Sequence, residues 1–405
     1  MSLNLPLDFL VEIFASKPFD LPLAIDHAVR EALPGRSIVM TGSLDVAEYQ
    51  RLGHCSRELQ AEPRPLISRR WGGEDHDRLY DNWQKALWGV TWQDKSLHVL
   101  YVQWDSSCGP VSRRWVIADT EDTADEFILD VSRKTNDPGE ALLVFRSGSW
   151  DRSRELFETV HKSSFDDLIL DESLKSSMRE DFARFLKSES EYVDLGLSWR
   201  RGALLIGPPG NGKTHCVRAL VKELGIPALY VQSLKHRYFE SEQLLQMVFD
   251  RARELRPSVL IMEDLDSLVD EQNQSFFLNQ LDGFERNHGL IVLATTNHPD
   301  RIDSAIIDRP SRFDRKYHFN LPTTEHRTQF LTGWRKKLSE RLSWSEDSVA
   351  RIAEKTADFS FAYLKELVIS SLLAWNADQS QTFDTIIAEQ RVLLAGQMRT
   401  SESGE

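Results

Sequence analysis

The chain has 405 residues, of which 41% are hydrophobic and 28% are charged, a composition typical of a globular protein with room for two or three domains. Its net charge of -14 disfavours a protein built mainly to bind the phosphate backbone of nucleic acid. The three cysteines, Cys55, Cys108 and Cys216, show no paired spacing, which excludes a disulfide scaffold or a zinc cluster of the usual spacing and fits a reducing compartment.

The N-terminal residues carry no basic leader ahead of their apolar stretch, so they do not resemble a signal or transit peptide. No window of the chain reaches the roughly 18 uninterrupted apolar residues that a membrane span needs. We therefore expect a protein without a membrane span that works in the cytoplasm.

Residues 1–160 predict an α+β N-terminal domain that is rich in tryptophan, since seven of the 11 tryptophans lie between Trp71 and Trp150. Residues 1–60 read mainly as helix, with a break at Pro34-Gly35. Further along we expect strands at 97–104, 113–119 and 141–148 and a helix at 123–134. No catalytic motif occurs in this segment, and its role stays open.

From about Ser164 the pattern becomes an alternation of strand and helix, which predicts a parallel sheet with helices on both faces. Its five apolar runs are 203–206, 228–231, 259–262, 290–294 and 316–319. We expect an α/β domain with a five-stranded sheet over residues 161–321. Helical periodicity after Pro322 (324–339, 346–356, 360–376 and 382–396) predicts a helical lid over 322–398, followed by a flexible tail at 399–405.

The strongest motif runs from Gly207 to Thr214 and fits G-x-x-x-x-G-K-[ST] between an apolar strand and a helix. Its glycines let backbone N–H groups turn toward phosphate oxygens, and the helix N-terminus adds partial positive charge. The lysine can reach the β- and γ-phosphates, and the threonine hydroxyl can bind Mg²⁺. The expected ATP-binding residues are Pro209, Gly210, Asn211, Gly212, Lys213, Thr214 and His215.

Two further apolar runs end in polar residues. Residues 259–262 are followed by Glu263 and Asp264, one of which can hold Mg²⁺ while the other orients the attacking water. By register we assign Glu263, with Thr214, to the metal and Asp264 to the water, although the two acids could exchange these roles. Residues 291–296 are followed by Asn297, which can hydrogen-bond the water or the γ-phosphate. Taken alone, the acids could equally cap a helix and the asparagine could belong to a turn.

Residues 309–315 concentrate three arginines in a short loop, and a guanidinium beside a transferring phosphoryl group stabilises its charge. We select Arg309 and Arg312 as the candidates. An arbitrary run of this kind would more often be a solvated basic turn.

These four elements, in this order and spacing, resemble the AAA ATPase family over roughly Ser164 to Ala374. The run from Phe165 to Gly202, the Glu-Asp order at the strand tip and Thr295-Thr296-Asn297-His298 are similar to the subgroup of the mitochondrial respiratory complex III assembly ATPase and its plant relatives. This chain departs from that subgroup in lacking its transmembrane segment. It also has Phe361-Ala362-Tyr363 where Gly-Ala-Asp is common in the lid.

The resemblance implies an ATP- and Mg²⁺-dependent ATPase that works as a homo-oligomeric ring, most simply a hexamer. It implies that Arg309 and Arg312 reach the nucleotide of the neighbouring subunit, that Asn297 is the sensor, and that Asp167 and Leu168 begin the adenine pocket. We expect hydrolysis to remodel or translocate a protein client. A scaffold that assembles on ATP and hydrolyses it slowly is the alternative, and the acidic balance disfavours a nucleic-acid motor.

The segment before Glu240-Ser241-Glu242 bears on that choice. In the family, the loop before a similar Gly-Glu-Ser-Glu lines the central pore and carries an aromatic residue that grips an extended chain. Tyr238 and Phe239 stand there in this sequence, with Phe239 in place of the glycine. They are candidate pore-loop residues, and the alternative is that they pack as a hydrophobic staple against the following helix.

Overall fold

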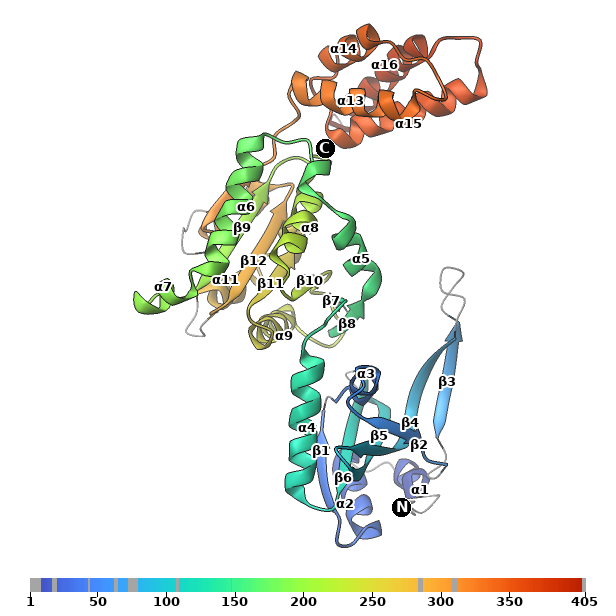
Figure 1. Ribbon diagram of the computed structural model, residues 1–405, viewed down its shortest axis with the longest axis vertical. Coiled ribbons are helices and arrows are strands. Elements are labelled where there is room, and N and C mark those ends of the chain that lie inside the picture. The colour runs from blue at the N-terminus through green and yellow to red at the C-terminus, as the bar shows by residue number, and fades with distance from the viewer. Residues whose placement is uncertain are drawn as a thin grey trace. The chain divides into compact units, whose positions relative to one another are not determined.

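The computed structural model describes residues 9–16, 20–42, 44–61, 65–71, 79–106, 109–146, 148–282, 287–307 and 312–402. The chain divides into two compact units, residues 1–137 and residues 138–405. Figure 1 shows both units and labels most of their elements.

The first unit is built on an antiparallel sheet of six strands in the order β1-β6-β5-β4-β2, with β3 also paired to β4. The strands are β1 (Ser37–Thr41), β2 (Ser56–Leu59), β3 (Leu66–Trp71), β4 (Leu79–Trp92), β5 (Lys95–Ser106) and β6 (Gly109–Ala118). The helices are α1 (Phe9–Ser16), α2 (Leu21–Ala32), α3 (Val46–Arg51) and α4 (Glu121–Asn136). The helix expected at 123–134 and the strands expected at 97–104 and 113–119 are confirmed.

Helices cover both faces of this sheet. Successive residues of a strand point to opposite sides, so each strand can place apolar side chains on both faces. Val99 and Val116, which are paired across β5 and β6, pack with Phe127 of α4. Their neighbours Leu100 and Trp115 pack on the other side with residues of α1 and α2. Each face therefore has its own core, and one buried tryptophan belongs to each, Trp92 to the first and Trp115 to the second.

The second unit contains a seven-stranded sheet in the order β13-β9-β12-β11-β10-β7-β8. The strands are β7 (Leu142–Arg146), β8 (Ser149–Ser153), β9 (Arg200–Ile206), β10 (Ala228–Val231), β11 (Ser258–Met262), β12 (Leu290–Thr296) and β13 (Arg315–His318). The five strands expected from the alternating pattern form consecutive parallel neighbours, from β13 to β10. The mixed α/β architecture with a mostly parallel sheet is therefore confirmed.

Residues 141–148 require a correction. They were expected in the N-terminal domain, but β7 pairs in parallel with β10 and β8 returns antiparallel beside β7. The sheet therefore has seven strands rather than five and begins before the expected boundary at residue 160. Residues 142–145 are four consecutive buried residues, as is typical of a strand covered on both faces. In sequence this apolar run looks like the antiparallel strands just before it, so the local pattern does not show which sheet it joins.

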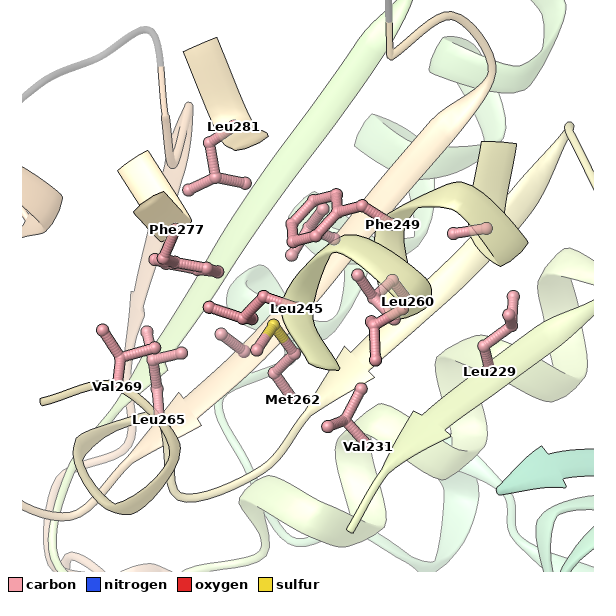
Figure 2. Close-up of a cluster of buried hydrophobic side chains, with 14 of the residues drawn as sticks. Leu229, Val231, Leu245, Phe249, Leu260, Met262, Leu265, Val269, Phe277 and Leu281 are labelled. Carbon is pink, nitrogen blue, oxygen red and sulfur yellow. The ribbon is translucent and has the colours of Figure 1, made fainter. Parts of the chain in front are cut away.

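Helices flank the sheet on both faces. Residues of α5 (Arg154–Lys162), α6 (Glu172–Lys187) and α8 (Lys213–Leu224) pack on one side. On the other side, α9 (Ser241–Glu254), α10 (Leu265–Leu268) and α11 (Gln274–Asp282) close a core around Phe249, Leu260 and Phe277, as Figure 2 shows. The shorter elements are η1 (Phe165–Asp167), α7 (Glu189–Asp194), η2 (Pro299–Arg301) and α12 (Ser304–Ile307).

The helical segment after Pro322 consists of α13 (Thr324–Leu338), α14 (Glu346–Glu354), α15 (Phe361–Ala377) and α16 (Phe383–Glu402). These helices share their own apolar core, which includes Trp344, Leu364 and Phe383. Because α16 continues to Glu402, most of the tail expected to be flexible at 399–405 is helical, and 403–405 lie outside the described residues. Within the part of the chain that the structure describes, no helix is long and apolar enough to cross a membrane.

Candidate functional site

The carboxyl ends of three parallel strands bring the predicted site residues together. In the register of the sheet, Ile206 of β9 lies beside Thr296 of β12, and Ala294 of β12 lies beside Met262 of β11. The residues that follow these strands, the Gly207 loop, Glu263 and Asn297, therefore emerge at one edge. Ligands of open α/β sheets bind at such edges.

The loop between β9 and α8 has the backbone that its glycines predict. Gly207, Gly210 and Gly212 have φ values of +155°, +79° and +90°, a range that favours glycine. A Cβ added to Gly207 would lie 2.1 Å from the carbonyl oxygen of Phe319, so the loop is also closely packed. At Gly207, where the chain leaves the strand, there is therefore space only for glycine.

Lys213 opens α8 and is buried, with 6% of its surface exposed. Its Nζ donates to the carbonyls of Gly207 and Pro208 at 2.5 and 2.9 Å and to Oδ1 of Asn297 at 2.6 Å. Burial lowers the pKa of Lys213, and the charges of Asp264, Asp266 and Glu263 oppose that shift. A desolvated ammonium at this edge is suited to binding phosphate oxygens.

Asn297 links the lysine to the acidic strand tip, because its Nδ2 donates to Oδ1 of Asp264 at 2.9 Å. Asp264 has a φ of +49°, in the left-handed region that a non-glycine residue seldom adopts. Its backbone N–H donates to the hydroxyl of Thr295 at 3.1 Å. This unusual backbone turns the exposed Asp264 carboxylate toward Asn297, so the structure joins Lys213, Asn297 and Asp264 in one chain of hydrogen bonds.

Three side-chain polar atoms at this edge have no hydrogen-bond partner in the described part of the chain. They are the buried Oε1 of Glu263 and both side-chain polar atoms of Asn211, whose side chain is 1% exposed. Buried polar atoms of this kind ordinarily have a partner. With the Thr214 hydroxyl one residue into α8, the oxygens of Glu263 fit Mg²⁺, and the glycine loop fits the phosphates of ATP.

The segment expected to begin the adenine pocket lies against the same loop. His215 of α8 hydrogen-bonds through Nε2 to the carbonyl of Ser164 at 3.1 Å. Leu168 is buried, and its Cδ2 would lie 3.2 Å from a Cβ added to Gly212, whereas Asp167 is exposed. The structure therefore places Leu168, and not the Asp167 side chain, against the loop.

The lid also reaches this loop, which the sequence motifs did not predict. The backbone N–H of Ala362 donates to the carbonyl of Gly210 at 3.1 Å. A Cβ added to Gly210 would lie 2.5 Å from the Cβ of Ala362 and 2.9 Å from Oγ of Ser360. Ser360 caps α15, so the start of that helix contacts the loop. A serine cap just ahead of an apolar helix was the available signal for the helix start.

Of the two candidate arginines, the structure describes only Arg312. Arg309 lies outside the described residues. Arg312 is 7% exposed, and its Nε donates to Oδ2 of Asp282 at 2.6 Å, with a further bond to the carbonyl of Ala305. In the single subunit its guanidinium is thus turned into its own chain, and action on a neighbouring subunit stays a prediction.

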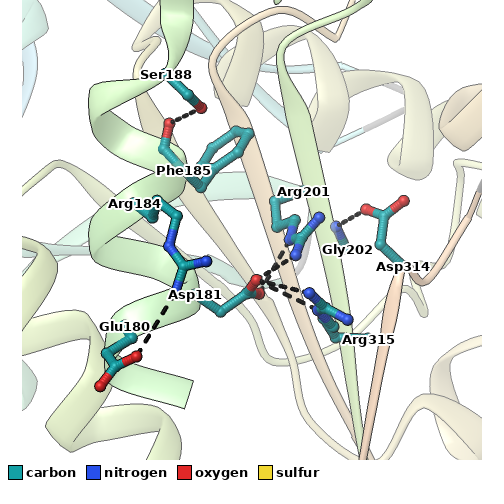
Figure 3. Close-up of polar contacts among 9 residues, drawn as sticks. All are labelled: Glu180, Asp181, Arg184, Phe185, Ser188, Arg201, Gly202, Asp314 and Arg315. Carbon is teal, nitrogen blue, oxygen red and sulfur yellow. Dashed lines mark hydrogen bonds and ion pairs between the residues drawn. The ribbon is translucent and has the colours of Figure 1, made fainter. Parts of the chain in front are cut away.

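An ion-pair cluster holds the backbone that follows Arg312 (Figure 3). Asp181 of α6 accepts hydrogen bonds from Arg201 of β9 and from Arg315 of β13. Burial alone would raise the pKa of Asp181, but the bonds from the two guanidinium groups outweigh it and place that pKa below its ordinary value. The backbone N–H of Gly202 also donates to Asp314 at 2.9 Å. The cluster therefore joins α6 to two neighbouring strands.

The two candidate pore-loop residues differ in how they pack. Phe239 packs against the core beside α9, with its ring 4.8 Å from the ring of His236, as a staple would. Tyr238 is 45% exposed. The structure therefore supports the packing alternative for Phe239 and leaves the Tyr238 side chain exposed.

Comparison with known proteins agrees with this geometry. Residues 203–321 match the family described as "ATPase family associated with various cellular activities (AAA)". An ATP-dependent zinc metalloprotease FtsH 2 from Salinibacter ruber is 33% identical over 260 residues, covering 60% of this chain and 36% of the relative. The ATPase family gene 2 protein of Saccharomyces cerevisiae is 31% identical over 258 residues, covering 60% of this chain and 32% of the relative. The chain spans about a third of the length of these relatives.

Proposed function

We propose that this chain is an AAA ATPase, since its residues 203–321 match that family, and that it hydrolyses ATP in a ring of identical subunits. It uses the hydrolysis to remodel or translocate a protein client. The observation that carries the proposal is the hydrogen-bonded chain from Lys213 through Asn297 to Asp264. It joins the cation for the phosphates to the carboxylate for the water through Asn297, which lies 84 residues after Lys213 in the sequence.

Each residue has a role that its position supports. The glycine loop and the N-terminus of α8 bind the phosphates with backbone N–H groups. Lys213 neutralises the charge that builds up on the β- and γ-phosphates, and Asp264 orients the attacking water with Asn297. Mg²⁺, when held by Thr214 and Glu263, would stabilise the negative charge of the phosphate oxygens. The Lys213 side chain exchanges its loop carbonyls for phosphate oxygens when ATP binds.

The ring, its form as a hexamer, and the protein client rest on the family. AAA proteins are typically oligomeric, and in this chain Arg309 and Arg312 would complete the site of the neighbouring subunit. The exposed Tyr238 supports a client that is gripped in the pore, and cytoplasmic action is part of the same proposal. The scaffold alternative is supported by Phe239, since one of the two candidate gripping residues already has a packing role.

We propose a narrower relationship as well, to the subgroup of the respiratory complex III assembly ATPase. It rests on the Glu263-Asp264 order at the strand tip and on Thr295-Thr296-Asn297-His298. The relatives named above do not belong to that subgroup by name, so the complex III function itself is not carried over.

One experiment tests the function. Purified full-length protein is assayed for ATP hydrolysis while its mass is measured with and without nucleotide, alongside Lys213→Ala and Asp264→Asn. We expect Lys213→Ala to lose productive ATP use, and Asp264→Asn to bind ATP in assembled rings with turnover reduced about a hundredfold or more. Asp347→Asn, on the surface of α14, is the matched control and should behave as the parent. Equal turnover in the parent and Asp264→Asn would refute the assignment.

Hydrolysis separates the remodeller from the scaffold. Clients captured on the Asp264→Asn protein should be released or unfolded by the parent protein with ATP. A parent that assembles on ATP while its captured partners stay folded and bound through many turnovers would favour the scaffold.

A further inference from the structure

The first unit contains a pocket of about 380 Å³ that no motif pointed to. It lies over the strands β4, β5 and β6, between α3 and β2, and three of its walls are aromatic. Trp83 and Trp88 meet edge to face with ring centroids 5.0 Å apart, and Tyr101 lies on the adjacent strand. Its volume is within the range of small-molecule and peptide side-chain pockets.

Two arginines enter the same pocket, each over one of the aromatic rings. The guanidinium of Arg57 lies 4.2 Å from the ring centroid of Trp88, and that of Arg114 lies 4.8 Å from that of Tyr101. The planar groups are held in place by hydrogen bonds to uncharged partners. Arg57 donates through Nε to Gln50 at 2.7 Å, and Arg114 donates through Nη1 to the carbonyl of Gly42 at 3.0 Å.

The charge of these two cations is not matched by an anionic contact among the residues that the structure describes. Within the described residues neither guanidinium forms an ion pair with a carboxylate, and Asp45 acts on both only through space. Burial lowers the pKa of Arg57 and of Arg114. Partly desolvated charges without a partner are costly, and a carboxylate or phosphate placed between two such groups makes strong, short hydrogen bonds.

The acids around the pocket favour a single negative charge. Asp81 also lines it but is paired with Arg69 at 3.1 Å, so its charge is already neutralised. Asp45 is left to face Arg57 and Arg114, and these three charges sum to about +1. A carboxylate matches that charge, whereas a dianionic phosphate would leave a net charge of about -1 in the pocket. Tryptophan, tyrosine and arginine in one pocket are also the residue types that dominate protein–protein binding sites.

We propose that this pocket binds a carboxylate of an extended protein segment, with the apolar side chain next to that carboxylate packed against Trp83 and Trp88. The carboxylate is either an acidic side chain or the free C-terminus of the partner. Binding itself does not require ATP hydrolysis. Only the use of the pocket to select clients rests on the proposed function.

The test is calorimetric titration of the full-length chain with four acetylated peptides that share an apolar residue at the fourth position. Two are pentapeptides, one with a free C-terminal carboxylate and one with a C-terminal amide. The other two are hexapeptide amides that carry aspartate or asparagine as their fifth residue. We expect the carboxylate or the aspartate peptide to bind at least about tenfold more tightly than its neutral counterpart. The stronger of the two identifies the source of the carboxylate.

Variants assign the binding to this pocket. Arg57→Gln and Arg114→Gln should each weaken the favoured peptide by roughly tenfold to a hundredfold, since each removes a charged hydrogen-bond donor. Arg51→Gln is the matched control and should leave the affinity unchanged. Arg51 belongs to α3, whose first residues line the pocket, but Arg51 does not line it. If loss of the Gly42 contact unfolds Arg114→Gln, Trp83→Leu tests the apolar wall in its place and should also weaken binding.

Several outcomes would overturn the proposal. Equal affinity for the acid and amide peptides, no binding of any peptide, or tighter binding of inorganic phosphate or AMP that Arg57→Gln abolishes would each do so. Lys213→Ala is titrated in parallel and should bind the peptide as the parent does. A failure of the proposed ATPase function is thereby distinguished from a failure of this pocket.

Discussion

Asp181 offers a sharp test of how the second unit is held together. It is 13% exposed at its side chain and receives hydrogen bonds from Arg201, which is 15% exposed, and from Arg315. The Asp181→Asn change keeps the shape of the side chain and removes its charge. It leaves the largely buried Arg201 guanidinium without an anionic partner.

The structure sets the size of the effect. Removing one partner of a buried ion pair costs about 3–5 kcal/mol, and the residual exposure here places the expected loss near the lower value, about 3 kcal/mol. For a unit of this size that corresponds to a fall in the unfolding midpoint of roughly 6–12 °C. The neighbouring Glu180→Gln is the matched control. Its pair with Arg184 spans 3.6 Å between side chains that are 70% and 76% exposed, so we expect a loss below about 0.5 kcal/mol.

The same pair predicts a pH dependence. Because the pKa of Asp181 is lowered in the folded protein, its carboxylate contributes stability above its unfolded pKa of about 3.9, and that stability is lost as the pH falls through the folded value. The difference in stability between the parent and Asp181→Asn should be constant at neutral pH. It should shrink as the pH is lowered below about 4.

Differential scanning calorimetry of the full-length proteins measures both quantities, since the transition of the second unit is the one that should move. A midpoint for Asp181→Asn within about 2 °C of the parent would show that solvent already screens this pair. A difference that grows as the pH falls would contradict the assigned sign of the pKa shift.

Three further predictions concern the arginine loop and the candidate pore loop. Gly202→Ala should lose at least about 2 kcal/mol by calorimetry, because its Cβ would lie 2.1 Å from the carbonyl oxygen of Arg312, and unchanged stability would mean that the loop yields without cost. Phe239→Ala should lower the free energy of unfolding by about 2 kcal/mol in chemical denaturation, because Phe239 packs against the core. Tyr238→Ala should change that free energy by less than about 0.5 kcal/mol, because Tyr238 is exposed, and should instead reduce client unfolding in rings of normal ATPase activity. Client unfolding that survives Tyr238→Ala would eliminate the gripping role. Arg312→Ala subunits mixed into parent rings should lower ATP turnover by more than their share, and a strictly proportional loss would argue against action on the neighbouring site.

The sequence by itself determined the features that local chemistry dictates. Only glycines at 207, 210 and 212 allow the backbone of the phosphate loop, and the apolar runs that form β9 to β13 stand out because strands buried on both faces admit few polar residues. The same reasoning located the polar strand tips at Glu263 and Asn297 and the four helices after Pro322, whose periodicity survives in the structure.

The tertiary structure decided what depends on partners far apart in the chain. Residues 142–146 carry the pattern of a buried strand, but nothing local says that they pair with β10 and not with the strands just before them. Tyr238 and Phe239 are adjacent aromatic residues, and the sequence does not show which of them is buried. The surrounding core determines that Phe239 packs inward and that Tyr238 stays exposed. The contacts of Lys213 with Asn297 and of Gly210 with Ala362 likewise join separate elements. Local patterns report which side chains need burial or a charged partner, whereas the choice of that partner is made by the packing of the whole unit.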